Sequence, residues 1–218
     1  YSVEECDVPV ENRPALHKFL EKRSRWLTWL DTDEQHAIWP ALSSIVWAEV
    51  RFRTLMRMAI DDPNNALNNT LLGEALIEGH LADQVLAIRR LLDKRSDVVS
   101  IRRLFADVKE NVALLTRENF VCFDGLPYDY EAVKYRTTPG KAGNRTIWGE
   151  TTGPNAWPFS ERAHEQFDRL AGIDPSQRTR EDRLPESLLE KIEIWLDDSD
   201  ANGIVLWSHK HLAHAADA

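Results

Sequence analysis

Apolar residues recur at helical spacing along most of the chain. The clearest stripe runs from Ile77 to Leu92, and a second follows a short turn, from Val98 to Leu115. Positions three and four apart share one helix face, so amphipathic helices are predicted over about 69–94 and 97–117. The short turn predicts an antiparallel hairpin of these two helices. The side chains expected in its core are Leu81, Val85, Ile88, Ile101, Phe105 and Val108.

Capping and helix-breaking residues delimit further helices. Asn12 is a suitable cap for a helix that runs to about Leu30. A helical run over about 34–60, which Pro40 either begins or kinks, ends at Asp61-Asp62-Pro63. Ser160 is expected to cap a short helix that Gly172 ends, and Pro185 is expected to open a helix through Leu196. A last helix is predicted over 204–217.

Residues 120–158 interrupt the helical pattern. They mix glycine, proline and aromatic residues without a helical period, so one long irregular loop region is predicted, with at most a short strand hairpin. Loops of this length are usually functional or mobile. The sequence therefore predicts an all-α helical bundle, a single domain over 1–218 with core helices over about 12–117 and 160–218.

Charge and cysteine content narrow the class of protein. The net charge of −9 excludes nucleic-acid binding by bulk attraction, so any such binding requires a local basic patch. Cys6 and Cys122 lie far apart without metal-type spacing, which argues against a disulfide scaffold and a zinc site. No apolar run is long enough for a membrane span. We expect a cytoplasmic protein in a reducing compartment.

Basic residues are concentrated in two stretches, 89–109 and 134–145. The candidate RNA-binding residues within them are Arg89, Arg102, Lys141 and Arg145. The second stretch contains glycines but lacks the spacing of a P-loop. The helix predicted near 186–200 is acidic, so the alternative is that acidic and basic helices solvate or pair with each other.

The segment Trp207-Ser-His-Lys-His-Leu-Ala-His214 holds three of the seven histidines. On a helix, Lys210, His214 and Asp217 run along one edge, which places the Asp217 carboxylate to orient the His214 imidazole. A neighbouring cation lowers the pKa of an imidazole, which suits His214 to act as a base near neutral pH. The alternative is structural, with the histidines packing within the bundle.

A metal site is the third chemical interpretation of the histidines. Glu161 and His164 form one Glu-x-x-His pair, but a di-iron bundle needs two such pairs and no second one is present. A metal-dependent hydrolase would hold its ion at His164, His211 or His214. We expect no metal and no cofactor.

The C-terminal segment carries a resemblance to a known family. Residues 207–214 resemble the W-R-N-K-x-x-A-H signature of HEPN domains, particularly the abortive-infection AbiU-like branch. Residues 79–92 and 97–104 also resemble that branch, and the likeness covers about 70–110 and 185–218. The resemblance implies a helical bundle, often dimeric, that acts as a metal-independent ribonuclease in a prokaryotic defence or toxin context such as phage defence.

Matched position by position, His214 takes the histidine of the family motif and His209 takes its polar position. Ser208 stands where the family has arginine. That arginine would hold the scissile phosphate and stabilise its developing charge, and serine cannot do so. This departure favours a protein without catalytic activity.

Two functions follow from the resemblance. In the first, the protein is an endoribonuclease in which a ribose 2′-OH attacks the adjacent phosphate, with His214 as general base or acid. Lys210, Arg89 or Arg102 would then replace the missing arginine. In the second, the protein is a catalytically silent module that binds a partner protein or a nucleotide. In both, a homodimer is expected with the last helix near its interface.

Overall fold

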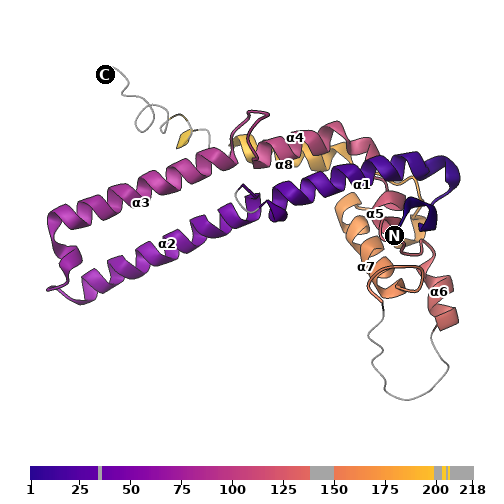
Figure 1. Cartoon of the computed structure of the whole chain (residues 1–218), viewed down its shortest axis with the longest axis horizontal. Helices are drawn as coiled ribbons and strands as arrows, with labels where there is room; N and C mark the ends of the chain where they lie inside the picture. Colours follow the sequence, from indigo (N-terminus) through magenta and orange to yellow (C-terminus); the bar gives the residue numbers. More distant parts are fainter. Residues whose placement is uncertain (34–35, 138–149, 199–202, 205, 207–218) are drawn as a thin grey trace, which may run out of the picture. The chain divides into compact units, whose positions relative to one another are not determined.

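The computed structural model describes residues 1–33, 36–137, 150–198, 203–204 and 206. In these ranges the chain is 72% helical and contains no strand, so the all-α prediction is confirmed (Figure 1). The α-helices are α1 (Arg13–Leu27), α2 (Ile38–Asp61), α3 (Thr70–Leu91), α4 (Ile101–Glu110), α5 (Arg117–Cys122), α6 (Tyr130–Thr137), α7 (Trp157–Ala171) and α8 (Glu186–Asp198). The helix predicted over 204–217 falls almost wholly outside the described residues.

The chain divides into two compact units. The first unit comprises residues 1–24 and 108–191, and the second comprises residues 25–107 and those from 192 onward. None of the helices in the described part combines the length and the apolar character that a bilayer crossing requires.

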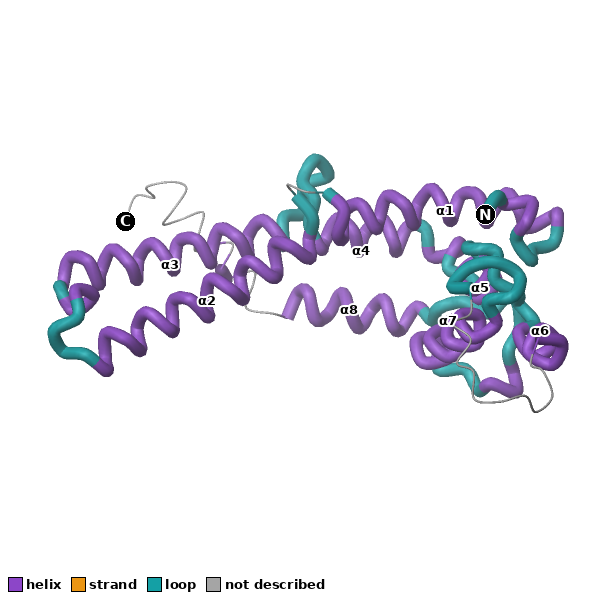
Figure 2. The backbone as a smooth tube through the Cα atoms, turned by 60° about the horizontal axis from the view of Figure 1, so that its bottom comes forward, coloured by secondary structure: helices purple, strands orange, loops and turns teal. Residues whose placement is uncertain are grey.

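A hairpin of α2 and α3 dominates the second unit (Figure 2). Pro40 lies in the first turn of α2, where its missing N–H removes no helical hydrogen bond, so the helix begins there and is not kinked. The Asn69 side chain accepts a hydrogen bond from the Leu72 amide and caps α3. The bounds of both helices therefore follow from residues recognisable in the sequence.

The predicted partner of α3 is wrong. α3 pairs with α2, and α4 continues away from the end of α3 instead of folding back along it (Figures 1 and 2). Leu81, expected in the core, is 53% exposed, and Phe105 is only half-buried. The physical reason is that short connections join α3 both to α2 and to α4. Either helix could therefore have folded back along α3, and the sequence pattern of α3 did not distinguish them.

Short helices with a buried polar face build the first unit. α5 and α6 each pack against α7, and the core includes Phe167, Leu16 and Val121. Residues 120–158, predicted as one long irregular loop region, also contain the end of α5, the short helix α6 and the start of α7.

The ends of α7 and α8 test the capping predictions. Ser160 does not cap α7, because the helix begins at Trp157 and the Ser160 hydroxyl donates to the Pro127 carbonyl oxygen. Gly172 ends α7 as predicted, with a left-handed φ of 67°. The predicted helix after Pro185 is confirmed as α8.

Candidate functional site

The catalytic candidates of the C-terminal motif, His209, Lys210, His214 and Asp217, lie outside the described residues. The same holds for the candidate RNA contacts Lys141 and Arg145. Of the candidate catalytic and RNA-binding residues, the structure describes Arg89 and Arg102.

Arg102 is committed to an interaction with α8. Its Nη1 donates to Asp197 Oδ1 at 2.7 Å, and its Nη2 donates to the Leu196 carbonyl oxygen. The hydrogen bond from Arg102 lowers the pKa of Asp197. The pairing of basic with acidic helices is therefore confirmed for this residue pair.

Arg89 differs from Arg102 in its surroundings. It lies in the last turn of α3, half-buried, and forms no ion pair with any residue in the described ranges. Of the two candidate RNA-binding arginines that the structure describes, Arg89 is the one whose charge is not compensated by a described residue.

A buried ionic cluster lies in the first unit, centred on Arg117. This guanidinium is fully buried, and Nη1 lies 2.7 Å from Asp168 Oδ1 while Nε lies 2.7 Å from Asp182 Oδ2. Arg178 binds Asp168 from the other side, with Nε 3.0 Å from Oδ2. Two arginines and two aspartates thus compensate one another out of water, as buried charges must.

The arginines control the ionisation of both aspartates. Burial alone would raise the pKa of Asp168, but hydrogen bonds from Arg178 and Arg117 outweigh it and lower that pKa. Burial also opposes ionisation of Asp182, and there hydrogen bonds from Thr179 and Arg117 lower the pKa. Both carboxylates are therefore charged at neutral pH and act as fixed acceptors, not as proton carriers.

His164 completes the cluster and is a structural histidine. Its Nε2 donates to the Tyr128 carbonyl oxygen at 3.0 Å, and Nδ1 lies 3.5 Å from Nη1 of Arg117. Burial, reinforced by the charges of Arg178 and Arg117, lowers its pKa to about 4. The imidazole is thus neutral with both nitrogens engaged, which leaves no lone pair for a metal at His164.

The metal interpretation finds no support elsewhere in the described ranges. No group of three or more His, Cys, Asp or Glu side chains gathers there in a way that could hold an ion. Cys6 and Cys122 are both free thiols in the interior.

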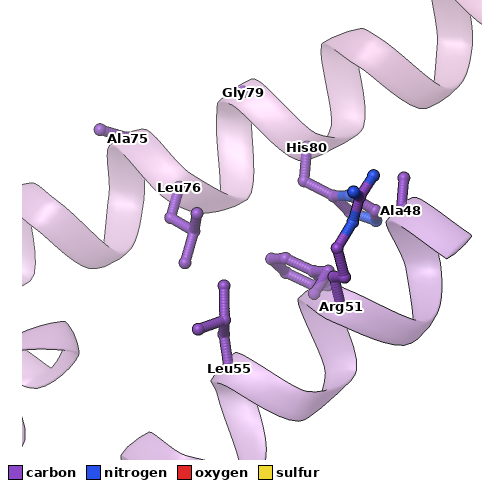
Figure 3. Close-up of a pocket in the computed structure, with 8 residues that line it drawn as sticks. Ala48, Arg51, Leu55, Ala75, Leu76, Gly79 and His80 are labelled. Atoms are coloured by element: carbon purple, nitrogen blue, oxygen red, sulfur yellow. The ribbon is translucent and has the colours of Figure 1, made fainter.

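An open apolar groove lies between α2 and α3 (Figure 3). Its volume is about 330 Å³, and it is lined by Ala48, Phe52, Leu55, Ala75, Leu76 and Gly79, together with Arg51 and His80. Three of these residues are small, and a Cβ added at Gly79 would meet no atom within 4 Å, apart from the adjacent part of its own helix. The groove therefore exists because the hairpin supplies too little side-chain volume to fill it.

A polar pair closes one edge of the groove. His80 Nε2 donates to Glu49 Oε2 at 2.9 Å, and the imidazole stacks on the Phe52 ring with centroids 4.0 Å apart. Hydrogen bonds from Arg53 and His80 lower the pKa of Glu49. The pair fixes the register of α2 against α3, since it joins residues from the middle of both helices.

Sequence analysis missed both the ionic cluster and the groove. The cluster is formed by residues far apart in the sequence, Arg117 with Asp168 and Asp182, and no local spacing predicts that contact. The groove had a recognisable signal, because Ala48, Ala75 and Gly79 are small residues within otherwise bulky apolar helices.

The arrangement offers one buried, self-compensated ionic cluster and one open apolar groove. Comparison of the chain with protein-family models, with curated proteins and with solved structures found no match to any of them.

Proposed function

We propose that this chain is a HEPN-like helical protein that acts on RNA as a metal-independent ribonuclease. The observation that carries the proposal is the C-terminal motif, in which His214 lies four residues after Lys210 and three before Asp217. The all-α architecture of the described residues is compatible with the family that the motif resembles. A role in prokaryotic defence or toxicity belongs to the same proposal.

The proposed chemistry requires a base and a cation. His214 takes the proton of a ribose 2′-OH as that oxygen bonds to the adjacent phosphorus, and the protonated imidazole then returns the proton to the 5′ oxygen that leaves as the P–O5′ bond breaks. Lys210 compensates the charge that develops on the phosphate. Arg89 is the second candidate to compensate that phosphate charge, because Arg102 already donates hydrogen bonds to Asp197 and to the Leu196 carbonyl oxygen of α8.

The test is cleavage of a labelled single-stranded RNA panel in the presence of EDTA, which removes metal-dependent nucleases. His214→Ala should lower the rate by about 10²–10⁴. The matched control is His17→Ala, because His17 is an exposed histidine in α1 outside the motif. Cleavage that survives His214→Ala would place the reaction elsewhere.

A second function is favoured by Ser208, which stands where the family motif has arginine. In this alternative the protein is a catalytically silent HEPN-like module that binds a partner protein or a nucleotide. If neither the wild-type protein nor the Ser208→Arg variant cleaves RNA, the result would support the silent module.

A further inference from the structure

The hairpin of α2 and α3 buries almost nothing between its ends. Ile38, Ala59 and Leu91 are its buried apolar residues among those described, and each lies near a helix end. Large apolar side chains along the middle of both helices remain exposed. A helix that is apolar over most of its circumference is normally covered by other helices, and two helices alone cannot enclose a core.

Exposed apolar side chains continue the groove along both helices. On α3, Leu72 lies four residues before Leu76, and Leu86 lies seven residues after Gly79, so both extend the groove's side of that helix. Trp47 lies four residues before Arg51 on α2 and extends the same side there. Trp47 is 64% exposed and Leu86 is 48% exposed. We call the side of the hairpin that holds the groove and these residues the groove face.

The groove face is large enough for a stable interface. α3 has 22 residues, so the face is about 33 Å long and roughly 20 Å wide, on the order of 700 Å² in flat outline. A standard interface takes about 800 Å² of accessible surface from each partner. A ridged helical surface exposes more than its flat outline, so covering this face meets that requirement.

The groove face also carries one uncompensated charge of each sign. Arg51 on α2 lines the groove, and Asp83 lies four residues after Gly79 on the same side of α3. Both side chains are exposed and neither forms an ion pair with another residue that the structure describes. By contrast, Arg53 and Arg57 each pair with an acid on their own helix.

A surface with one cation and one anion on an apolar groove is complementary to a copy of itself. With a two-fold axis parallel to the helices, α2 of each copy lies against α3 of the other, and both hairpin tips point the same way. Glu49 lies level with His80, and α2 and α3 run in opposite directions, so Arg51 and the partner's Asp83 differ in level by roughly 7.5 Å, about one and a half helical turns. The arginine and aspartate side chains together span that distance.

We infer that the groove face is the interface of a homodimer, in which the α2–α3 hairpins of two copies form an antiparallel four-helix bundle. Arg51 of each copy pairs with the partner's Asp83, and the partner's side chains fill the groove above Gly79. This interface lies on the hairpin and not on the last helix, and the inference does not depend on ribonuclease activity.

Gly79→Leu is the most selective test of this interface. A Cβ at position 79 meets no neighbouring atom within 4 Å, and leucine favours helix more than glycine does, so the protein should fold with unchanged helical signal. It fills the space that the partner needs, however. Light scattering coupled to gel filtration at micromolar concentration should show a dimer for the wild type and a monomer for Gly79→Leu.

Two further variants separate the two sides of the hairpin. Leu86→Glu should also give the monomer, whereas Leu81→Glu should remain dimeric, because Leu81 is similarly exposed on α3 but lies two residues from Gly79, on the other side. Arg51→Glu should weaken the dimer at least tenfold at low salt, and Arg51→Glu with Asp83→Arg should restore it. A monomeric wild type, a dimeric Gly79→Leu, or a dimer lost in Leu81→Glu but kept in Leu86→Glu would overturn the assignment.

Discussion

Arg117 and Asp182 are joined twice, once by their side chains and once by their backbones. The Arg117 Nε donates to Asp182 Oδ2 at 2.7 Å, and the Arg117 amide donates to the Asp182 carbonyl oxygen at 2.9 Å. These two bonds tie the first turn of α5 to a segment that follows α7 in the sequence. The contact orders a stretch that has no sheet or long helix of its own.

Removal of the Arg117 charge should therefore cost much of the stability. Arg117→Met leaves Asp168 and Asp182 without a shared cation in the interior, which typically destabilises by about 3–5 kcal/mol. Urea unfolding followed by circular dichroism measures the loss. The control is Arg53→Ala, because its ion pair with Glu49 is exposed and its loss should leave the stability nearly unchanged. Equal losses in the two variants would show that the buried cluster is not a stabilising element.

His164 should make the free energy of unfolding depend on pH between about 4 and 6.5. In the folded protein its pKa is lowered to about 4, whereas in the unfolded chain it has its ordinary value of 6.5. Below pH 6.5 the unfolded state therefore binds a proton that the folded state does not, so stability falls as pH falls and this effect is complete below pH 4. Across this pH range the contribution of His164 to the free energy of unfolding should fall by about 3 kcal/mol.

His164→Gln isolates that contribution, because glutamine does not titrate. The variant should be less stable than the wild type at pH 7 but should lose less stability between pH 7 and pH 4. Urea midpoints across this range measure both slopes. The lowered pKa values of Asp168 and Asp182 act with the same sign, but below their ordinary value of 3.8. Parallel slopes in the two proteins would contradict a neutral, buried His164.

The sequence predicted single helices better than it predicted their contacts. The bounds of α3 and α8 depend on local signals, the Asn69 cap and Pro185. Pro185 was recognised, and the predicted helix over about 69–94 began at Asn69 without identifying it as the cap. The pairing of α3 with α2 depends on how the chain turns at both ends of α3. α2 carries exposed apolar residues on several sides, so its pattern did not identify the face that α3 covers.

Because their buried residues are polar, α5 and the ionic cluster around Arg117 were not predicted from the sequence. Arg117, Glu118 and Asn119 are consecutive polar residues that are all buried in α5. A search for apolar periodicity treats such a segment as exposed loop, because burial of charge requires partners that only the tertiary fold supplies. The same limit explains why the cluster around Arg117 was not predicted.

Gly172 tests the backbone requirement at the end of α7. Its φ of 67° is a conformation that glycine adopts without strain, so Gly172→Ala should destabilise by roughly 1–2 kcal/mol. Gly172→Asn should cost less, because asparagine tolerates the left-handed region better than alanine does. Thermal melting compares the two variants, and nothing lies within 4 Å of an added Cβ to confuse the comparison with a clash. An asparagine variant that is less stable than the alanine variant would refute the backbone explanation.

Arg89 and Arg102, the two candidate RNA-binding arginines in the described ranges, should respond differently to RNA. Arg102 donates to Asp197 and to the Leu196 carbonyl oxygen, whereas Arg89 has no ion pair within the ranges that the structure describes. If Arg89 contacts a phosphate, Arg89→Gln should reduce the slope of log K against log salt by about 0.7 for a single-stranded RNA, with little change in the melting temperature. Arg102→Gln should leave that slope unchanged and lower the melting temperature, because it breaks the contact with α8.

Fluorescence anisotropy of a labelled RNA at several salt concentrations measures the slope. A reduced slope in Arg102→Gln and an unchanged slope in Arg89→Gln would reverse the assignment, since RNA would then have to displace Asp197 from the Arg102 guanidinium.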